Sequence, residues 1–98
     1  MTIYEHVTSL TVSGGTKQST TLSIQGGLLR QVLVRASSDT TAFTAKIAKD
    51  GTDLLDWGIH TEEINDIDLA FPVAGNYQLT IQNATYDDLF TVRLGVQE

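Results

Sequence analysis

The sequence contains no cysteine, a single proline and no long hydrophobic run. Without cysteine, neither disulfides nor a thiolate metal site can hold the fold together, so apolar packing must stabilise it. No stretch approaches the roughly 20 apolar residues of a membrane-spanning helix, and the first residues lack the basic start and apolar core of a signal peptide. We therefore expect a soluble protein with no membrane association and no export signal.

Positive charge is also scarce, and it is unevenly distributed. Residues 1–49 carry five basic and two acidic side chains, whereas residues 50–98 carry ten acidic side chains and one basic, for a net charge of −6. A nucleic-acid-binding surface needs clustered positive charge to neutralise phosphates, and this sequence has only scattered basic residues. We expect no nucleic-acid partner. The imbalance serves solubility or, alternatively, makes the two ends of neighbouring copies complementary in charge.

What the sequence does contain is a repeated alternation of apolar and polar residues, which is typical of strands with one buried face. The clearest example is Gly75–Val96, where the pattern predicts two strands that pair as a hairpin. The expected strands are residues 3–12, 20–25, 28–36, 43–49, 53–59, 66–69, 77–81 and 90–96. Eight short strands without any helical period favour an all-β fold. We predict one domain, residues 1–98, that is an antiparallel two-sheet sandwich, jelly-roll-like, with about eight strands.

Two local signals refine this outline. Asp50-Gly51 lies between two alternating runs and predicts a tight hairpin, because both residues tolerate the positive φ that such turns need. Pro72 has no amide hydrogen for a β ladder, so we place it in a turn at residues 71–75. The segment from His60 to Glu63 has no alternation and is expected to be a loop.

No residue set indicates catalysis. His6 and His60 lie far apart in the sequence with no nucleophile or carboxylate at a motif spacing, and we expect surface or rim positions for both. The acids of residues 62–68 and 87–88 match no calcium loop, so we predict no metal and no cofactor. Of the aromatic residues, Trp57 and Tyr77 lie on apolar faces, whereas Tyr86 lies in a polar turn. Tyr86 is therefore the candidate for a carbohydrate-stacking platform.

One part of the sequence resembles a known group of proteins. The motifs are Gly26–Val34, then Thr40-Thr41 with Phe43 and Ile47 before Asp50-Gly51, and later Ala74-Gly75-Asn76-Tyr77 with Leu79 and Ile81. Across residues 26–83 this pattern resembles small β-sandwich virion proteins of tailed bacteriophages. The Ala-Gly-x-Tyr-x-Leu-x-Ile portion also occurs in jelly-roll domains that bind carbohydrate.

The resemblance implies a capsid decoration (cement) protein, made in the host cytoplasm and located on the phage head. Such proteins are not enzymes and are often trimeric, so the implied partners are the major capsid protein and further copies of the chain. Within residues 28–36, Leu29, Leu33 and Arg35 share the less dry face. We expect them to form a subunit or capsid contact, with Arg30 at its border. A carbohydrate-binding module that uses Tyr86, and a head-closure or tail component, are the alternatives.

Overall fold

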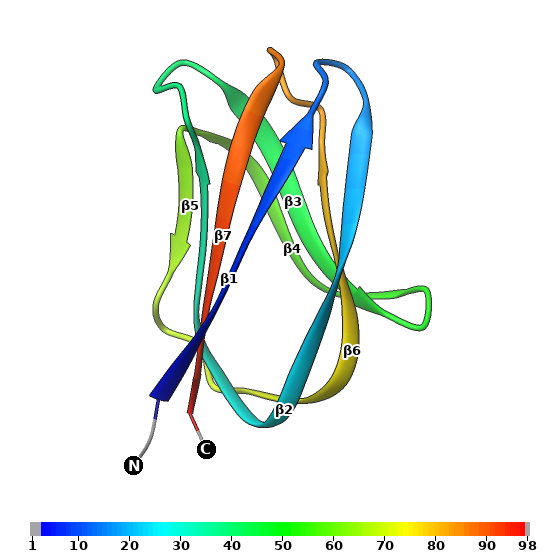
Figure 1. Ribbon diagram of the computed structural model, residues 1–98, viewed down its shortest axis with the longest axis vertical. Helices are drawn as coiled ribbons and strands as arrows, with labels where there is room; N and C mark the ends of the chain where they lie inside the picture. Colours follow the sequence, from blue (N-terminus) through cyan, green and yellow to red (C-terminus); the bar gives the residue numbers. More distant parts are fainter. Residues whose placement is uncertain (1–2, 98) are drawn as a thin grey trace.

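The computed structural model describes residues 3–97, apart from the side chains of Ile3, Tyr4 and Gln25. It shows an all-β chain in which every strand pairing is antiparallel, as the sequence predicts (Figure 1). The strands are β1 (Ile3–Val12), β2 (Lys17–Ala36), β3 (Ala42–Lys49), β4 (Thr52–Thr61), β5 (Glu63–Asp66), β6 (Phe71–Gln82) and β7 (Asp88–Gln97). The 20-residue β2 covers two of the strands expected from the sequence.

The strands are hydrogen-bonded in the order β1-β7-β2-β6-β3-β4, with β5 attached to β2 off this path. The long strand β2 is the junction. Its first half pairs with β6, from Lys17 opposite Gln82 to Ile24 opposite Gly75, and after a register shift the pairing continues to Leu29 opposite Phe71. Its second half pairs with β7 on one side and with β5 on the other. One strand therefore belongs to two different sets of neighbours.

The sheet folds back on itself, and the core lies inside the fold. Phe43 on β3 and Phe90 on β7 meet edge to face with ring centroids 4.8 Å apart, although β2 and β6 separate their strands in the sheet. Such edge-to-face pairs add roughly 1 kcal/mol beyond the area that they bury. The largest fully buried side chains belong to Val12, Leu29, Val32, Val34, Phe43, Ile64, Leu79, Ile81, Phe90, Val92, Leu94 and Val96.

The β3–β4 hairpin has the turn that the sequence predicts. Asp50 and Gly51 have φ of 52° and 80°, and Lys49 lies opposite Thr52. Positive φ at both central residues is the geometry whose twist matches that of the flanking strands. The Asp-Gly pair therefore determines this connection locally.

The hairpin expected within Gly75–Val96 is not formed. Both strands exist, but β2 lies between β6 and β7 in the sheet. Alternation identifies the buried face of a strand, whereas the backbone hydrogen bonds that choose its neighbour are available to any strand. The prediction of the two strands was right, and the prediction of their pairing was wrong.

Two further boundaries differ from the prediction. The sixth strand runs from Glu63 to Asp66 rather than through residues 66–69, because Glu62 has a φ of 71° and reverses the chain there. Pro72 lies inside β6, opposite Leu28, and not in a turn. The pairing of β3 with β6 covers only residues 78–82 of β6, so among the described residues Pro72 has a strand on one side only. That is the edge position in which a strand tolerates proline.

Candidate functional site

The residues expected to form a contact surface do not all lie on one face. Leu29 is 1% exposed and belongs to the core, so the prediction that it shares the outer face was wrong. The register between β2 and β7 shifts between Leu29 and Gln31, which inserts Arg30 as an extra residue and reverses the parity. Arg30 and Arg35 are exposed, and Leu33 is half-buried.

Leu33 and Arg35 lie on a continuous surface formed by four strands. Cross-strand partners point to the same face of a sheet, and Leu33 is opposite Arg93 on one side and Asn65 on the other. Arg93 in turn lies opposite Val7. We call this surface the outer sheet face. Its principal side chains are Val7, Leu33, Arg35, Leu89 and Arg93.

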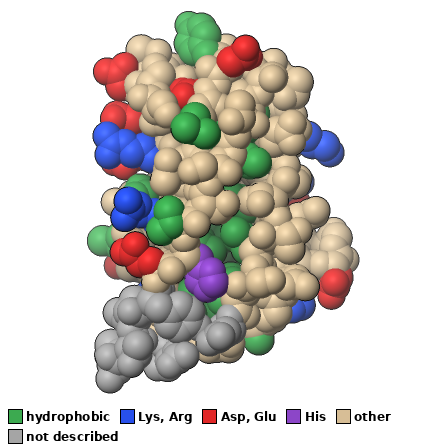
Figure 2. Space-filling model, in the orientation of Figure 1, with side chains coloured by type: hydrophobic (Ala, Val, Ile, Leu, Met, Phe, Trp, Pro, Cys, Tyr) green, Lys and Arg blue, Asp and Glu red, His purple; other side chains and the backbone are tan. Residues whose placement is uncertain are grey.

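The outer sheet face carries two of the exposed large hydrophobic side chains of the described residues; others, such as Ile59 and Ile67, lie on β4 and after β5. Val7 is 56% exposed and Leu89 is 45% exposed, and both are large aliphatic side chains on the solvent side of their strands. Thr11 and Thr91 lie near them, in cross-strand contact with Leu89 and Arg35 respectively. Figure 2 shows basic and acidic side chains close together along the left side of the molecule, with some hydrophobic side chains near them.

Ion pairs border this surface. Arg93 Nη1 lies 3.6 Å from Glu5 Oε2, and Arg35 Nη2 lies 3.4 Å from Glu62 Oε1. Gln31 donates a hydrogen bond of 3.3 Å to Asn65 Oδ1. All four charged side chains are largely solvent-exposed, so each pair contributes less than about 1 kcal/mol and can be exchanged for a partner's charges.

A second exposed feature lies at the end of the molecule where three connections meet. Tyr86 is 60% exposed in the β6–β7 connection. The backbone around it is fixed, because Gly14 donates a hydrogen bond of 2.6 Å to Asp87 Oδ1 and Gly15 donates one to the Ala84 carbonyl. The expectation that Tyr86 is exposed in a turn is confirmed.

Asp88 holds the same end of the molecule together. Its carboxylate accepts hydrogen bonds of 2.7–3.2 Å from the Thr41 hydroxyl and from the backbone amides of Ser37, Ser38 and Leu89. Burial alone would raise the pKa of Asp88, but these hydrogen bonds, that of Thr41 first among them, lower the pKa below its ordinary value. The ionised carboxylate is thus a structural element of this end.

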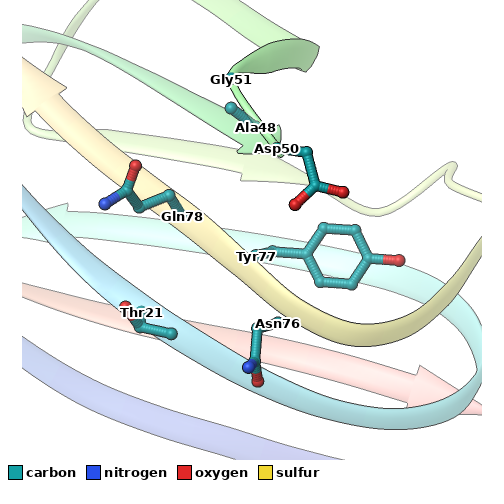
Figure 3. Close-up of a pocket in the computed structure, with 7 residues that line it drawn as sticks. All are labelled: Thr21, Ala48, Asp50, Gly51, Asn76, Tyr77 and Gln78. Atoms are coloured by element: carbon teal, nitrogen blue, oxygen red, sulfur yellow. The ribbon is translucent and has the colours of Figure 1, made fainter.

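Two hollows lie at the surface of the described residues and have polar side chains in their linings. The first, of about 200 Å³, lies beside Tyr77 between Thr21, Asn76 and Asp50 (Figure 3). Tyr77 itself is only 6% exposed, its hydroxyl accepts a hydrogen bond from the Ala74 amide, and Lys49 Nζ lies 4.6 Å from its ring centroid. Tyr77 is a core residue, as the sequence predicts.

The second hollow, of about 220 Å³, lies between β4 on one side and β5 with the residues that follow it on the other. Trp57, half-buried here, donates a hydrogen bond of 3.1 Å from Nε1 to Asp66 Oδ2, and His60 Nδ1 lies 2.7 Å from the Gly58 carbonyl oxygen. Within residues 3–97, no group of three His, Asp or Glu side chains is placed to hold a metal ion. The described part of the chain also has no helix long and apolar enough to span a membrane.

Comparison with known proteins identifies a fold and no family. No family model and no curated protein matches the sequence. Among solved structures, the chain is similar to the Aeromonas hydrophila protein PliG, a periplasmic lysozyme inhibitor of g-type lysozyme. The TM-score is 0.51 at 16% sequence identity, over 97% of this chain and 86% of that one. At this identity the likeness shows a shared fold alone.

Sequence reasoning missed three residues of the outer sheet face: Val7, Leu89 and Arg93. A signal for Val7 was available, because it shares its parity with Glu5 and Ser9 and is an aliphatic side chain among polar ones. Leu89 and Arg93 could not be placed beside Leu33 from the sequence. Their proximity depends on β7 pairing with β2, and the alternation of either strand does not specify that pairing.

Proposed function

We propose that this chain is a protein-binding domain, without enzymatic activity, whose outer sheet face docks on a partner protein. The observation that carries the proposal is the exposure of Val7 and Leu89 beside the half-buried Leu33 and two arginines on one rigid sheet. Interfaces combine apolar anchors with arginine, and such anchors supply most of the binding free energy. A surface built on strands loses little conformational entropy when it binds.

We infer that the strands work as a two-layer, jelly-roll-like sandwich. The second half of β2, with β1, β7 and β5, forms one layer, and the first half of β2, with β6, β3 and β4, forms the other. The Phe43–Phe90 contact joins the two layers. In this arrangement the outer sheet face lies on the solvent side of its layer, where a partner protein can bind it.

The specific role that we propose is capsid decoration on a phage head, with the major capsid protein as partner. The resemblance within residues 26–83 suggests this role. A repeated lattice would multiply individually modest contacts, each burying roughly 800 Å² per partner, by simultaneous attachment. A homotrimer is the assembly that the resemblance favours.

A double substitution on the outer sheet face tests the proposal. Arg35→Glu with Leu33→Asp should abolish binding to empty capsids, because it removes one positive charge from the contact surface and adds two negative ones, a net change of about −3. The matched control is Lys17→Glu with Thr21→Asp, which makes the same change of charge at exposed positions on the first half of β2. Binding is measured by co-sedimentation, and circular dichroism checks both folds. Normal capsid binding by the outer-face variant would show that this surface is not the contact.

Two alternative functions depend on Tyr86 at the loop end. An exposed aromatic ring on a fixed backbone suits stacking on a sugar, and it also suits insertion into a protein cleft. Since PliG inhibits g-type lysozyme, inhibition of a lysozyme by this chain is the corresponding protein-directed alternative. Tyr86→Ala should leave capsid binding unchanged under our proposal. Loss of glycan-array binding would favour the carbohydrate module, and loss of inhibition in a cell-wall lysis assay would favour the inhibitor.

A further inference from the structure

The strands at the two ends of the main strand order, β1 and β4, differ in how they are protected against further pairing. β4 pairs with β3 through two register shifts, one between Phe43 and Ala45 and one between Ile47 and Ala48. It also carries Asp53 and Asp56. Bulges and charges are the usual means by which an edge strand avoids adding another strand. The β4 edge is therefore protected against pairing with a further strand.

The β1 edge has no bulge and only one charged residue. Ten consecutive residues of β1 pair with β7 without a register shift, from Ile3 opposite Gln97 to Val12 opposite Asp88. The strand contains no proline, glycine or lysine, and Glu5 is its one charged residue. Within residues 3–97, β7 is the only strand with which β1 pairs. Figure 1 shows β1 diverging from the first half of β2 below the turn that joins them.

We propose that β1 pairs antiparallel with β1 of a second copy, about a two-fold axis at Val7. This register places Val7 opposite Val7 of the other copy and Glu5 opposite Ser9, so that like charges do not meet. It covers an aliphatic side chain that is 56% exposed in the single chain. Pairs of β-branched residues are among the favourable cross-strand neighbours. The β1 sequence is thus complementary to itself.

The pairing would join the two outer sheet faces into one surface. The four strands β1, β7, β2 and β5 of each copy would become eight hydrogen-bonded strands. A two-fold contact alone produces a dimer. A two-fold contact combined with a three-fold axis produces a hexamer. The protein should therefore contain an even number of copies, and the homotrimer that the resemblance favours would be present as half of a hexamer. The proposed function does not depend on this pairing, because every single copy has a complete outer sheet face.

Single cysteines test the register, since the chain has no cysteine of its own. Val7→Cys should form a disulfide-linked dimer on mild oxidation, because directly opposite residues have Cα atoms about 4.5–5.5 Å apart, within the range of a disulfide. The matched control is Ser9→Cys on the same face, since two Ser9 residues would be offset by four positions, roughly 14 Å along the strands. We expect Ser9→Cys to cross-link at least tenfold more slowly.

Light scattering of the unmodified protein gives a second measurement that does not depend on any variant. A dimer or hexamer supports the pairing, and Val7→Lys should then halve the mass by bringing two positive charges together. A monomer or an isolated trimer overturns it, as does equal cross-linking of the two cysteine variants. The proposal is also wrong if β1 instead pairs with a strand of a different protein. In that case light scattering would show a monomer alone and a larger mass only after that protein is added.

Discussion

The two halves of β2 are one strand in two different environments. The first half has β6 on one side, and its outward residues Ser19, Thr21 and Ser23 are exposed. The second half has β7 on one side and β6 and then β5 on the other; of its outward residues, Leu33 is half-buried and Arg35 is exposed. The number of neighbouring strands, rather than the strand itself, decides how apolar each half can be. The change occurs at Gly26-Gly27.

The largest test of this difference uses two buried leucines on β2, Leu29 and Leu22, which are 1% and 5% exposed. Leu29→Ala should lower the free energy of unfolding by about 3 kcal/mol, because its surroundings are fixed by strands on both sides and cannot collapse into the cavity. Leu22→Ala should cost about 2 kcal/mol, since an edge can relax. Urea denaturation measures both. An equal or larger loss for Leu22→Ala would contradict the comparison.

The point where the halves meet provides the next test. A Cβ added to Gly27 would lie 2.5 Å from the Gln97 carbonyl oxygen, whereas a Cβ on Gly26 would meet nothing within 4 Å. Gly27→Ala should therefore cost about 2 kcal/mol by forcing β2 and β7 apart. Gly26→Ala should change stability by less than about 0.5 kcal/mol. Thermal melts of the two variants side by side measure the difference, and equal melting temperatures would show that the close approach is absent.

The smallest effect concerns the residues just after the second half of β2, where the Asp88 carboxylate accepts hydrogen bonds from the amides of Ser37 and Ser38. The folded-state pKa of Asp88 is lowered, so the unfolded chain takes up the proton first as the pH falls. The stabilisation is complete above about pH 4, the ordinary range of an aspartate, and is lost as the pH falls through the folded-state pKa. Asp88→Asn should cost about 1 kcal/mol at pH 7, after allowance for solvent exposure.

The pH dependence supplies the control for Asp88. The difference in unfolding free energy between the unmodified protein and Asp88→Asn should shrink as the pH falls below about 4. Asp39, which is also acidic and exposed at the same end of the molecule, offers a matched substitution, Asp39→Asn. If the difference in unfolding free energy between the unmodified protein and Asp88→Asn stays constant from pH 7 to pH 3, the ionised carboxylate does not stabilise the fold.

Parts of the candidate site could be predicted and parts could not. Leu33 and Arg35 share a face because a strand alternates, and their positions follow from the sequence alone. Leu29 was misplaced because the bulge at Arg30 depends on how β7 pairs with β2, and the local sequence has no turn signal there. Val7 and Arg93 join Leu33 through pairings between residues distant in the chain.

The sequence by itself determined the all-β class, the turn at Asp50-Gly51 and the buried face of most strands. These features depend on side-chain periodicity and on local φ preferences, which act between near neighbours. Only the tertiary structure decided that β2 separates β6 from β7, that Pro72 lies in a strand and that β1 has an edge without bulges. Backbone hydrogen bonds are the same for every residue pair, so the choice among strand partners is made by how the whole core packs.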